Sequence, residues 1–215
     1  MIVIIDYGVG NLFSLTASLN YLGADTKVTA DKHDLEVADK IILPGVGAFE
    51  DAKKKLEATG LVDTIMEQVE LGKPMLGICL GMQLLFDESH EYGIHKGLGL
   101  INGTIASISD DLRSAGKETV QTLAGEEELK VPHIGWNALT FPEDEPLFKN
   151  INQGDCVYYV HSFYGRDCEA NTIATSEYGI TITGAVRNGN VYGTQFHPEK
   201  SGEVGLNILK AFIDM

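Results

Sequence analysis

A cysteine between two glycines stands where one apolar stretch of this chain gives way to another. The run Met75–Ile78 has the length of a buried strand, Cys79 follows it, and Met82–Phe86 has apolar residues at helical spacing. A strand that passes directly into a helix needs a sharp turn, and Gly77 and Gly81 leave room for both elements to approach it. The motif predicts a strand–turn–helix unit of an α/β fold. The Cys79 sulfur would lie at the helix N-terminus, where the thiolate is favoured.

The glycine-flanked cysteine is a weak signal by itself, because the chain has 24 glycines and three cysteines. A free cysteine is often a small buried residue of a central strand, and Cys79 could be one. The segment His197, Pro198, Glu199 near the end of the chain favours chemistry instead. If this segment is extended, His197 and Glu199 point to one face, and the carboxylate can orient the imidazole. The alternative for these two residues is a capped turn and a solvated charge.

Length and composition limit the classes of protein that the chain can belong to. With 215 residues and 44% hydrophobic content, we expect a single soluble domain spanning residues 1–215. The net charge of −15 would repel phosphate groups, so neither nucleic acid nor an anionic membrane is an expected partner. No apolar run is long enough to span a membrane, and the first residues lack a basic leader, which predicts a cytoplasmic protein. The cysteines form no CxxC pair and the six histidines are scattered, so no metal or other cofactor is expected.

Short β-branched runs alternate with amphipathic stretches along most of the chain. This alternation predicts an α/β fold with a central, mostly parallel sheet flanked by helices. A smaller antiparallel region is expected in the C-terminal half, where Asn188 and Gly189 favour a tight hairpin turn that leads to His197. Residues 102–131 are polar and acidic and are expected to form a long excursion over the surface. Strands are predicted at 2–5, 41–43, 75–78 and 157–160, and helices at 12–22, from 48, at 61–69, at 82–86 and at 204–212.

Seven motifs together resemble a known family, the class I, triad-type glutamine amidotransferases. Two of them match the nucleophile segment and the His–Glu segment of that family, GICLGMQ at 77–83 and QFHPE at 195–199. Within the family, the others are similar to the glutaminase subunits of imidazole glycerol phosphate synthases: DYGVGN at 6–11, LPGVG at 43–47, PHIGWN at 132–137, YYVHS at 158–162 and FHPEKSG at 196–202. The motifs occur in order over nearly the whole chain, which makes the set far more specific than any one member.

The resemblance implies a glutaminase with a catalytic triad of Cys79, His197 and Glu199. Cys79 would attack the glutamine carboxamide, His197 would transfer protons, and Glu199 would orient His197. The backbone N–H groups of Val46 and Leu80 would stabilise the oxyanion, with a peptide flip at Gly45. Other family positions that line the glutamine pocket are matched by Gly47, Gln83, His161, Ser162 and Phe163. Without the resemblance, Gln83 would be interpreted as a solvated helix residue, and His161 and Ser162 as the end of a strand.

The resemblance also implies a partner chain. In the family, the glutaminase forms a heterodimer with a cyclase of the (β/α)₈ barrel type, which joins the ammonia to a phosphoribosyl carboxamide substrate. The positions that face this cyclase are matched here by Asn11, Pro132, Trp136, Tyr158 and Lys200. Trp136 has an equally plausible alternative role as an anchor of the core.

Two other functions remain open from the sequence. The chain could be a different glutaminase, such as the subunit of pyridoxal phosphate synthesis or a free-standing γ-glutamyl hydrolase, or it could be a non-catalytic interaction subunit. DYGVGN and PHIGWN weigh against the first, and the intact Cys79, His197 and Glu199 weigh against the second. The segment 102–130 departs from the family: it is longer and more acidic than expected, and Asn102 and Gly103 stand where a proline–glycine turn is expected. Loop contacts with the partner are the part of the resemblance that this departure affects.

Overall fold

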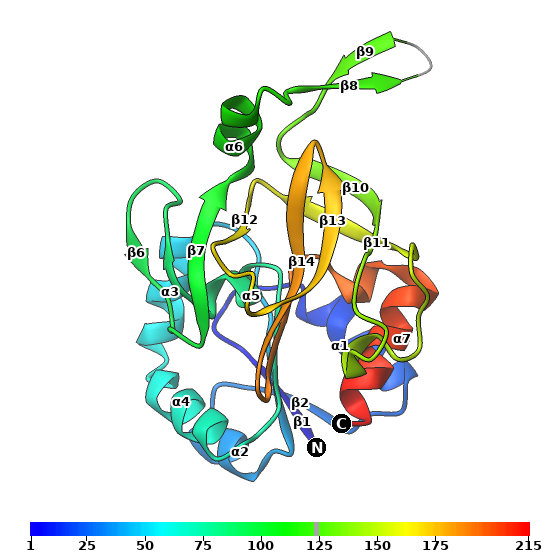
Figure 1. The fold of residues 1–215 in the computed structure, drawn as a ribbon. Coiled ribbons are helices and arrows are strands. Elements are labelled where there is room, and N and C mark those ends of the chain that lie inside the picture. The colour runs from blue at the N-terminus through cyan, green and yellow to red at the C-terminus, as the bar shows by residue number, and fades with distance from the viewer. Residues whose placement is uncertain (123–124) are drawn as a thin grey trace.

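The computed structural model describes residues 1–122 and 125–215 (Figure 1). Within this part of the chain, the largest sheet has seven strands in the order β13-β14-β15-β4-β3-β1-β2. Its last five strands are parallel to one another, β14 pairs antiparallel with β15, and β13 pairs antiparallel with β14, so the predicted mostly parallel sheet is confirmed. The strands are β1 (Ile2–Ile5), β2 (Thr26–Thr29), β3 (Lys40–Leu43), β4 (Met75–Ile78), β13 (Thr172–Tyr178), β14 (Ile180–Asn188) and β15 (Val191–Thr194).

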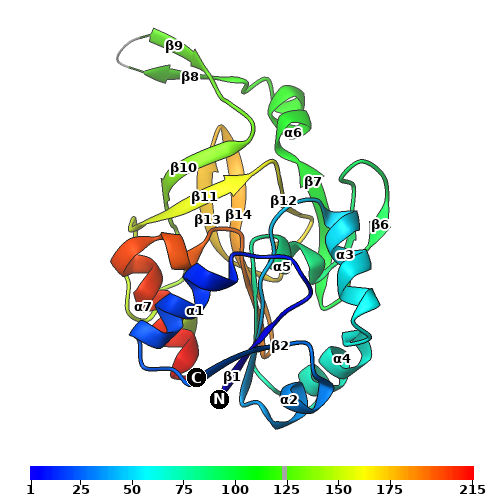
Figure 2. The same cartoon turned by 180° about the vertical axis from the view of Figure 1, so that it is seen from behind.

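Helices cover both faces of the parallel strands (Figures 1 and 2). Alternate residues of β1 enter two different cores: Val3 and Ile5 pack with one group of helices, and Ile2 and Ile4 with the other. The period-2 geometry of a strand buried on both faces explains this division. One face carries α2 (Lys32–Val37), α3 (Phe49–Ala58) and α4 (Val62–Glu70), and the other carries α1 (Leu12–Tyr21) and α7 (Gly202–Ile213).

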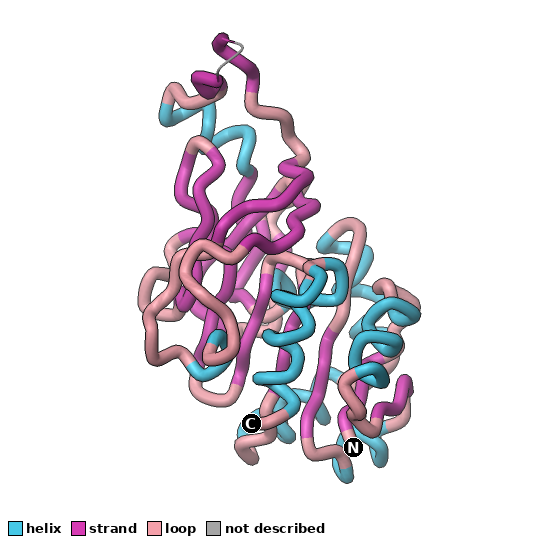
Figure 3. The backbone as a smooth tube through the Cα atoms, turned by 90° about the vertical axis from the view of Figure 1, so that its right-hand side faces the viewer, coloured by secondary structure: helices cyan, strands magenta, loops and turns pink. Residues whose placement is uncertain are grey.

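Smaller sheets lie on the side of the central sheet where the parallel strands end (Figures 1 and 3). One of them contains β12, β7, β5 and β6, and another pairs β10 with β11 antiparallel. The β8–β9 hairpin extends away from the rest of the molecule. The strands are β5 (Phe86–Ser89), β6 (His95–Lys96), β7 (Ile101–Ser107), β8 (Thr119–Thr122), β9 (Gly125–Glu128), β10 (His133–Ala138), β11 (Cys156–His161) and β12 (Phe163–Arg166). The remaining helical segments are α5 (Leu80–Leu84), α6 (Ile108–Ala115) and the 3₁₀ turns η1 (Pro146–Phe148) and η2 (Pro198–Lys200).

The predicted extent of the helix after Cys79 and the predicted surface excursion at 102–131 are both wrong. The helix after Cys79 ends at Leu84, and Phe86 already begins β5, because this apolar run is buried as a strand beside β7. The segment 102–131 is not a surface excursion throughout: its first half forms β7 and α6, and Ile105, Ile108 and Leu112 are buried. Their one-sided apolar pattern was hidden by the surrounding polar residues. Positions 123 and 124 of this segment lie outside the described residues.

The predicted hairpin is present as β14 and β15, but its turn lies one residue later than predicted: Asn188 pairs with Val191, and Gly189, with a positive φ of 58°, and Asn190 form the turn. No helix in the described part of the chain is both long and apolar enough to span a bilayer.

The turn between β4 and α5 depends on glycines that have no space for a side chain. A Cβ atom on Gly81 would lie 1.9 Å from the carbonyl oxygen of Leu43, and one on Gly77 would lie 2.7 Å from the carbonyl oxygen of Gly81. A Cβ on Gly45 would lie 2.6 Å from the Gly81 nitrogen. The strand, the turn and the neighbouring loop therefore contact one another through bare backbone, as the sequence predicts for Gly77 and Gly81.

Substitution Gly81→Ala should destabilise the protein by at least ~3 kcal/mol, because the obstructing atom belongs to a backbone carbonyl that cannot rotate away. Gly72→Ala is the matched control: Gly72 has a positive φ of 90° and open space around it, so only ~1 kcal/mol of backbone strain is expected. Denaturant unfolding of both variants measures the difference. Equal losses of stability would contradict the close packing at Gly81.

Candidate active site

Cys79 occupies the turn between β4 and α5 in a backbone conformation that is unfavourable for a residue with a side chain. Its φ is 55° and its ψ is −111°, and it is the N-cap of α5. Its backbone N–H donates to the carbonyl oxygen of Thr194, the last residue of β15, over 2.7 Å. The predicted strand–turn–helix unit is therefore present, and Cys79 does not lie within the strand. A strained residue held in this way often marks a functional site.

His197 and Glu199 follow β15 and form a hydrogen-bonded pair. His197 Nδ1 and Glu199 Oε1 are 2.8 Å apart, and the two side chains are only 2% and 4% exposed. The sequence predicted an extended segment here, and this prediction is wrong, because Pro198 begins the 3₁₀ turn η2. The tight turn still brings the two side chains together. Hydrogen bonds from the His197 N–H to the Tyr158 carbonyl and from the Ser201 hydroxyl to the His197 carbonyl fix the backbone.

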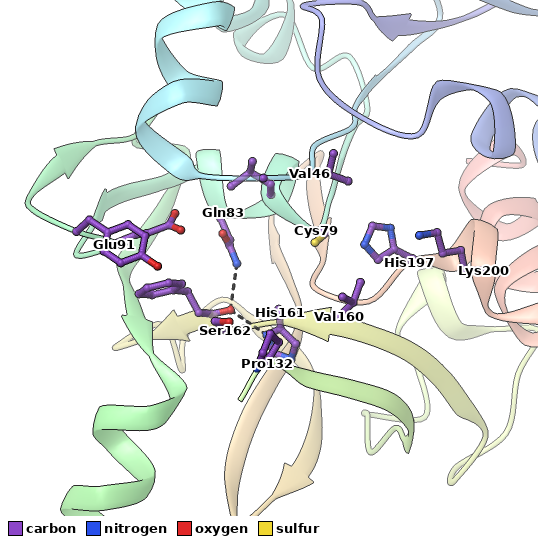
Figure 4. Close-up of a pocket in the computed structure, with 14 residues that line it drawn as sticks. Val46, Cys79, Gln83, Glu91, Pro132, Val160, His161, Ser162, His197 and Lys200 are labelled. Atoms are coloured by element: carbon purple, nitrogen blue, oxygen red, sulfur yellow. Dashed lines mark hydrogen bonds between the residues drawn. The ribbon is translucent and has the colours of Figure 1, made fainter. Parts of the chain in front are cut away.

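The electrostatic environment of His197 favours its protonated form. Burial by itself lowers the pKa of His197, but the Cys79 side chain and the Glu199 carboxylate more than compensate and raise this pKa to about 9. His197 Nε2 is buried and makes no hydrogen bond with the described part of the chain. The imidazole lies beside the Cys79 sulfur (Figure 4). At neutral pH the His197 side chain is therefore an imidazolium beside the Cys79 sulfur.

The side chains of Cys79 and His197 line a cavity of about 410 Å³. This volume is within the range of small-molecule sites. Glu199 is not among the lining residues and lies behind His197. Seven residues that the resemblance assigns to the oxyanion or glutamine site line the same cavity: Val46, Gly47, Leu80, Gln83, His161, Ser162 and Phe163.

Gln83 is buried, so its interpretation as a solvated helix residue is wrong. Its side-chain amide donates to the Phe163 carbonyl over 3.1 Å and to Gln195 Oε1 over 3.0 Å. The Gln195 amide in turn lies 3.8 Å from the Cys79 sulfur. His161 is indeed the last residue of β11, but it also lines the cavity and is buried. These contacts link α5, β12 and the segment before His197 around the sulfur.

The loop between β3 and α3 brings Val46 to the cavity beside Leu80. Leu80 is the first residue of α5, where backbone N–H groups have no partner within the helix. Tyr7 stabilises the Val46 loop, because its buried hydroxyl donates to the Pro44 carbonyl over 2.6 Å. The DYGVGN motif contains Tyr7, but nothing in the sequence pointed to this contact.

Three further residues, Glu91, Tyr92 and Val160, line the cavity although the sequence did not predict them there. Glu91 and Tyr92 line the cavity from the segment after β5. The Glu91 carboxylate accepts a hydrogen bond of 2.6 Å from the Phe49 N–H, and burial raises its pKa. Glu91 stands in a polar stretch with no periodic pattern, so only the tertiary structure reveals that it is buried.

Two of the residues predicted to face a partner, Pro132 and Lys200, also line this cavity. Trp136 is 56% exposed, so its alternative role as a core anchor is wrong. Its ring packs edge-on against Tyr158 across the β10–β11 pair, with centroids 5.8 Å apart. Asn11 caps α1 and borders a small adjacent cavity together with Glu199.

The described residues contain no group of three or more His, Cys, Asp or Glu side chains placed to hold a metal ion. The arrangement places the Cys79 sulfur, a protonated imidazole beside it and a carboxylate that orients the imidazole, which are the groups of nucleophilic catalysis.

The raised pKa of His197 predicts a pH dependence of stability. Because the pKa of about 9 in the folded protein lies above the ordinary value of 6.5, the stabilisation is complete below pH 6.5 and is lost as the pH rises to about 9. Over this interval the free energy of unfolding should fall by up to ~3 kcal/mol. Denaturant unfolding at several pH values measures this change. In Glu199→Gln the fall should be smaller, and the same slope in both proteins would contradict the role of Glu199.

Comparison with known proteins agrees with the geometry. The sequence model of the family described as Glutamine amidotransferase class-I matches residues 3–215. The imidazole glycerol phosphate synthase subunit HisH of Listeria monocytogenes serotype 4b (strain CLIP80459) is 48% identical, over 99% of this chain and 94% of the relative. The subunit of the same name from Syntrophotalea carbinolica is 47% identical over the full length of both.

Solved structures show the same fold at much lower identity. The structure of PurLQS from Thermotoga maritima has a TM-score of 0.71 at 20% identity and covers 99% of this chain and 97% of that one. A crystal structure described as that of a glutamine amidotransferase has a TM-score of 0.69 at 20% identity and covers 98% of both chains. With the family match and the closely related sequences, the chain belongs to the class-I glutamine amidotransferases and, within them, to the HisH subunits of imidazole glycerol phosphate synthase.

Proposed function

We propose that this chain hydrolyses glutamine through a thioester on Cys79 and supplies the ammonia to a cyclase partner that forms imidazole glycerol phosphate in histidine biosynthesis. The observation that supports this most strongly is that Cys79 and His197 line one cavity of about 410 Å³, while Glu199 forms a buried hydrogen-bonded pair with His197 behind it. The 45–48% identity to HisH subunits over nearly the whole chain supports the same conclusion.

The reaction takes place in two stages. The Cys79 thiolate attacks the side-chain carbonyl carbon of glutamine, and the backbone N–H groups of Val46 and Leu80 stabilise the oxyanion. The His197 imidazolium donates its proton to the departing nitrogen, which leaves as ammonia while the thioester forms. Neutral His197 then takes a proton from water, and the hydroxide attacks the thioester to give glutamate and to restore the thiolate. Glu199 holds His197 in one orientation throughout.

The cavity offers complementary groups for the rest of glutamine. The Glu91 carboxylate lines the cavity and is a suitable partner for the substrate's α-ammonium group. Gly47, Gln83, His161, Ser162 and Phe163 would enclose the remainder of the substrate. A buried Gln83 that is already hydrogen-bonded to its neighbours provides a rigid wall rather than a mobile one.

A partner is part of the proposal because ammonia is mostly protonated in neutral water and would be lost by diffusion. The related proteins are named as subunits of a synthase. We place the cyclase, of the (β/α)₈ barrel type, on the face that carries Asn11, Pro132, Trp136, Tyr158 and Lys200. Pro132 and Lys200 also line the cavity, so ammonia would be released close to this face. The substrate of the cyclase is phosphorylated and crosses membranes poorly, which is consistent with a cytoplasmic heterodimer.

Substitution Cys79→Ala should abolish glutamine hydrolysis, by at least ~10⁴-fold, because the nucleophile is lost. Synthesis by the complex with added ammonia should remain, since the cyclase does not need the thiol. Glutamate release and product formation are measured separately. Cys156→Ala is the matched control, because Cys156 is an exposed thiol outside the cavity. Residual glutamine hydrolysis at the wild-type rate would show that another residue is the nucleophile.

The isolated chain should hydrolyse glutamine slowly, and the cyclase with its substrate bound should accelerate this reaction. Val46 is 41% exposed in a loop with Gly47 at a positive φ of 97°, so the oxyanion donor can be repositioned by a partner. We expect an increase of at least ~10-fold, within the usual range of coupling between sites. Glutamate release is measured with the chain alone, with the cyclase, and with both cyclase and substrate. Equal rates in all three mixtures would contradict this activation.

A further inference from the structure

Two buried histidines other than His197 form a hydrogen-bonded pair at the wall of the cavity. His133 begins β10 and His161 ends β11, and the register of the two strands places them directly opposite each other. His133 Nδ1 and His161 Nε2 are 2.9 Å apart, and the two residues are 1% and 6% exposed. His161 lines the cavity, whereas His133 lies behind it. The proposed mechanism uses neither imidazole for proton transfer.

The outer nitrogen of each ring, His161 Nδ1 and His133 Nε2, is hydrogen-bonded to an oxygen atom that can only accept. His161 Nδ1 lies 2.8 Å from the Phe163 carbonyl oxygen, so it must carry a proton and donate it. His133 Nε2 lies 2.8 Å from Asn137 Oδ1, which also requires a proton on the nitrogen. The bond between the two rings needs a third proton. Two neutral imidazoles carry only two, so three satisfied hydrogen bonds give the pair one positive charge.

The orientation of the Asn137 amide supports this proton count. Its nitrogen donates to the Glu177 carbonyl oxygen over 2.7 Å. Turning the amide would let it donate to His133 and would remove the need for the extra proton. It would also bring Asn137 Oδ1 to 2.7 Å from the Glu177 carbonyl oxygen, and two acceptors at that distance repel each other.

The surroundings both oppose and support a charge. Burial lowers the pKa of each imidazole, and the protonated His197 faces His161 and repels a second charge. On the other side, the His133 ring stacks against the faces of two tyrosines, with centroids 3.9 Å from Tyr178 and 5.0 Å from Tyr159. Such faces attract cations.

Two acidic residues belong to the elements around the pair: Glu91 lines the same cavity as His161, and Glu177 contacts Asn137. The Glu177 carboxylate accepts from the Thr181 hydroxyl, so Glu177 offers only its carbonyl oxygen, to Asn137.

We propose that His133 is a positioning residue that shares one extra proton with His161 at neutral pH and thereby fixes the His161 wall of the glutamine pocket. The inference rests on the proposed function only where it concerns glutamine. The same strand carries Ile134 and Trp136, which are exposed, between the inward residues His133 and Asn137. β10 therefore holds the histidine pair on one side and a surface available to a partner on the other.

The shared proton can be observed directly by nitrogen NMR of the wild-type chain with ¹⁵N-labelled histidine. At pH 7 we expect His161 Nδ1 and both His133 nitrogens to have the shifts of protonated or proton-sharing atoms. His133→Phe and His161→Phe variants assign the signals. A bare His133 Nε2 at pH 7, with the shift of an unprotonated imidazole nitrogen, would overturn the proposal. This measurement does not depend on activity.

Kinetics of the complex with the cyclase test the positioning role. His133→Phe retains a ring between the tyrosines but leaves His161 Nε2 without a donor, so the KM for glutamine should rise by ~10-fold and kcat should change by less than ~3-fold. Tyr178→Phe is the matched control, because it removes only a hydroxyl that donates to the Lys130 carbonyl at the outer edge of the same stack. Its KM should stay within ~2-fold of wild type.

The KM of wild type for glutamine should also rise as the pH increases, because the shared proton is lost. The KM of His133→Phe should not depend on pH in this way.

The outcomes separate this inference from the proposed function. If wild type hydrolyses glutamine and the two variants have the same KM and the same pH profile, the role of His133 is wrong and the glutaminase function stands. If wild type releases no glutamate even with the cyclase, the proposed function fails, and the NMR result still decides whether the proton is shared. Should His133→Phe not fold, the pH dependence of KM in wild type together with the NMR result decides the proposal.

Discussion

The close contact between the β4–α5 turn and the β3 strand is the constraint on which the site depends. A side chain at Gly81 would overlap the Leu43 carbonyl, so the turn can approach β3 only as bare backbone. The bond from the Cys79 N–H to Thr194 ties the same turn to β15. Cys79 is thus held at a positive φ at the end of β4, which lies between the parallel strands β3 and β15. β3 leads to the loop that carries Val46, and β15 leads to His197.

Burial of polar groups is the second feature of the site. His197 and Glu199 are almost completely removed from water, yet the pKa of His197 is raised because its partners outweigh the cost of burial. Gln83 and the His133–His161 pair are buried nearby, and each is hydrogen-bonded. A cavity with such walls holds its donors and acceptors in fixed positions, and fixed dipoles stabilise a developing charge better than mobile water does.

Much of the architecture could be predicted because local patterns and tertiary structure agree. The runs at β1, β3 and β4 are apolar on both faces, and the leucine stripe of α1 has one buried side, so their elements follow from periodicity. The predictions failed where the pattern was short or mixed. The predicted helix after Cys79 was too long, and the segment that forms β7 and α6 was predicted to be a surface excursion. In both cases a neighbouring strand, distant in the sequence, decided the conformation.

The sequence by itself was enough to select Cys79, His197 and Glu199 as the proposed nucleophile and its helpers, because all three stand in recognisable motifs, GICLGMQ and QFHPE. It did not reveal the contacts of Glu91, Tyr7 or His133: Glu91 stands in a stretch with no pattern, and the motifs that contain Tyr7 and His133 do not show what these side chains contact. Only the tertiary structure decided that Glu91 lines the cavity, that Tyr7 binds the Pro44 carbonyl and that His133 meets His161. The physical reason is that these contacts join segments far apart in the chain. Their energies depend on distance and burial, and neither quantity is set by local sequence.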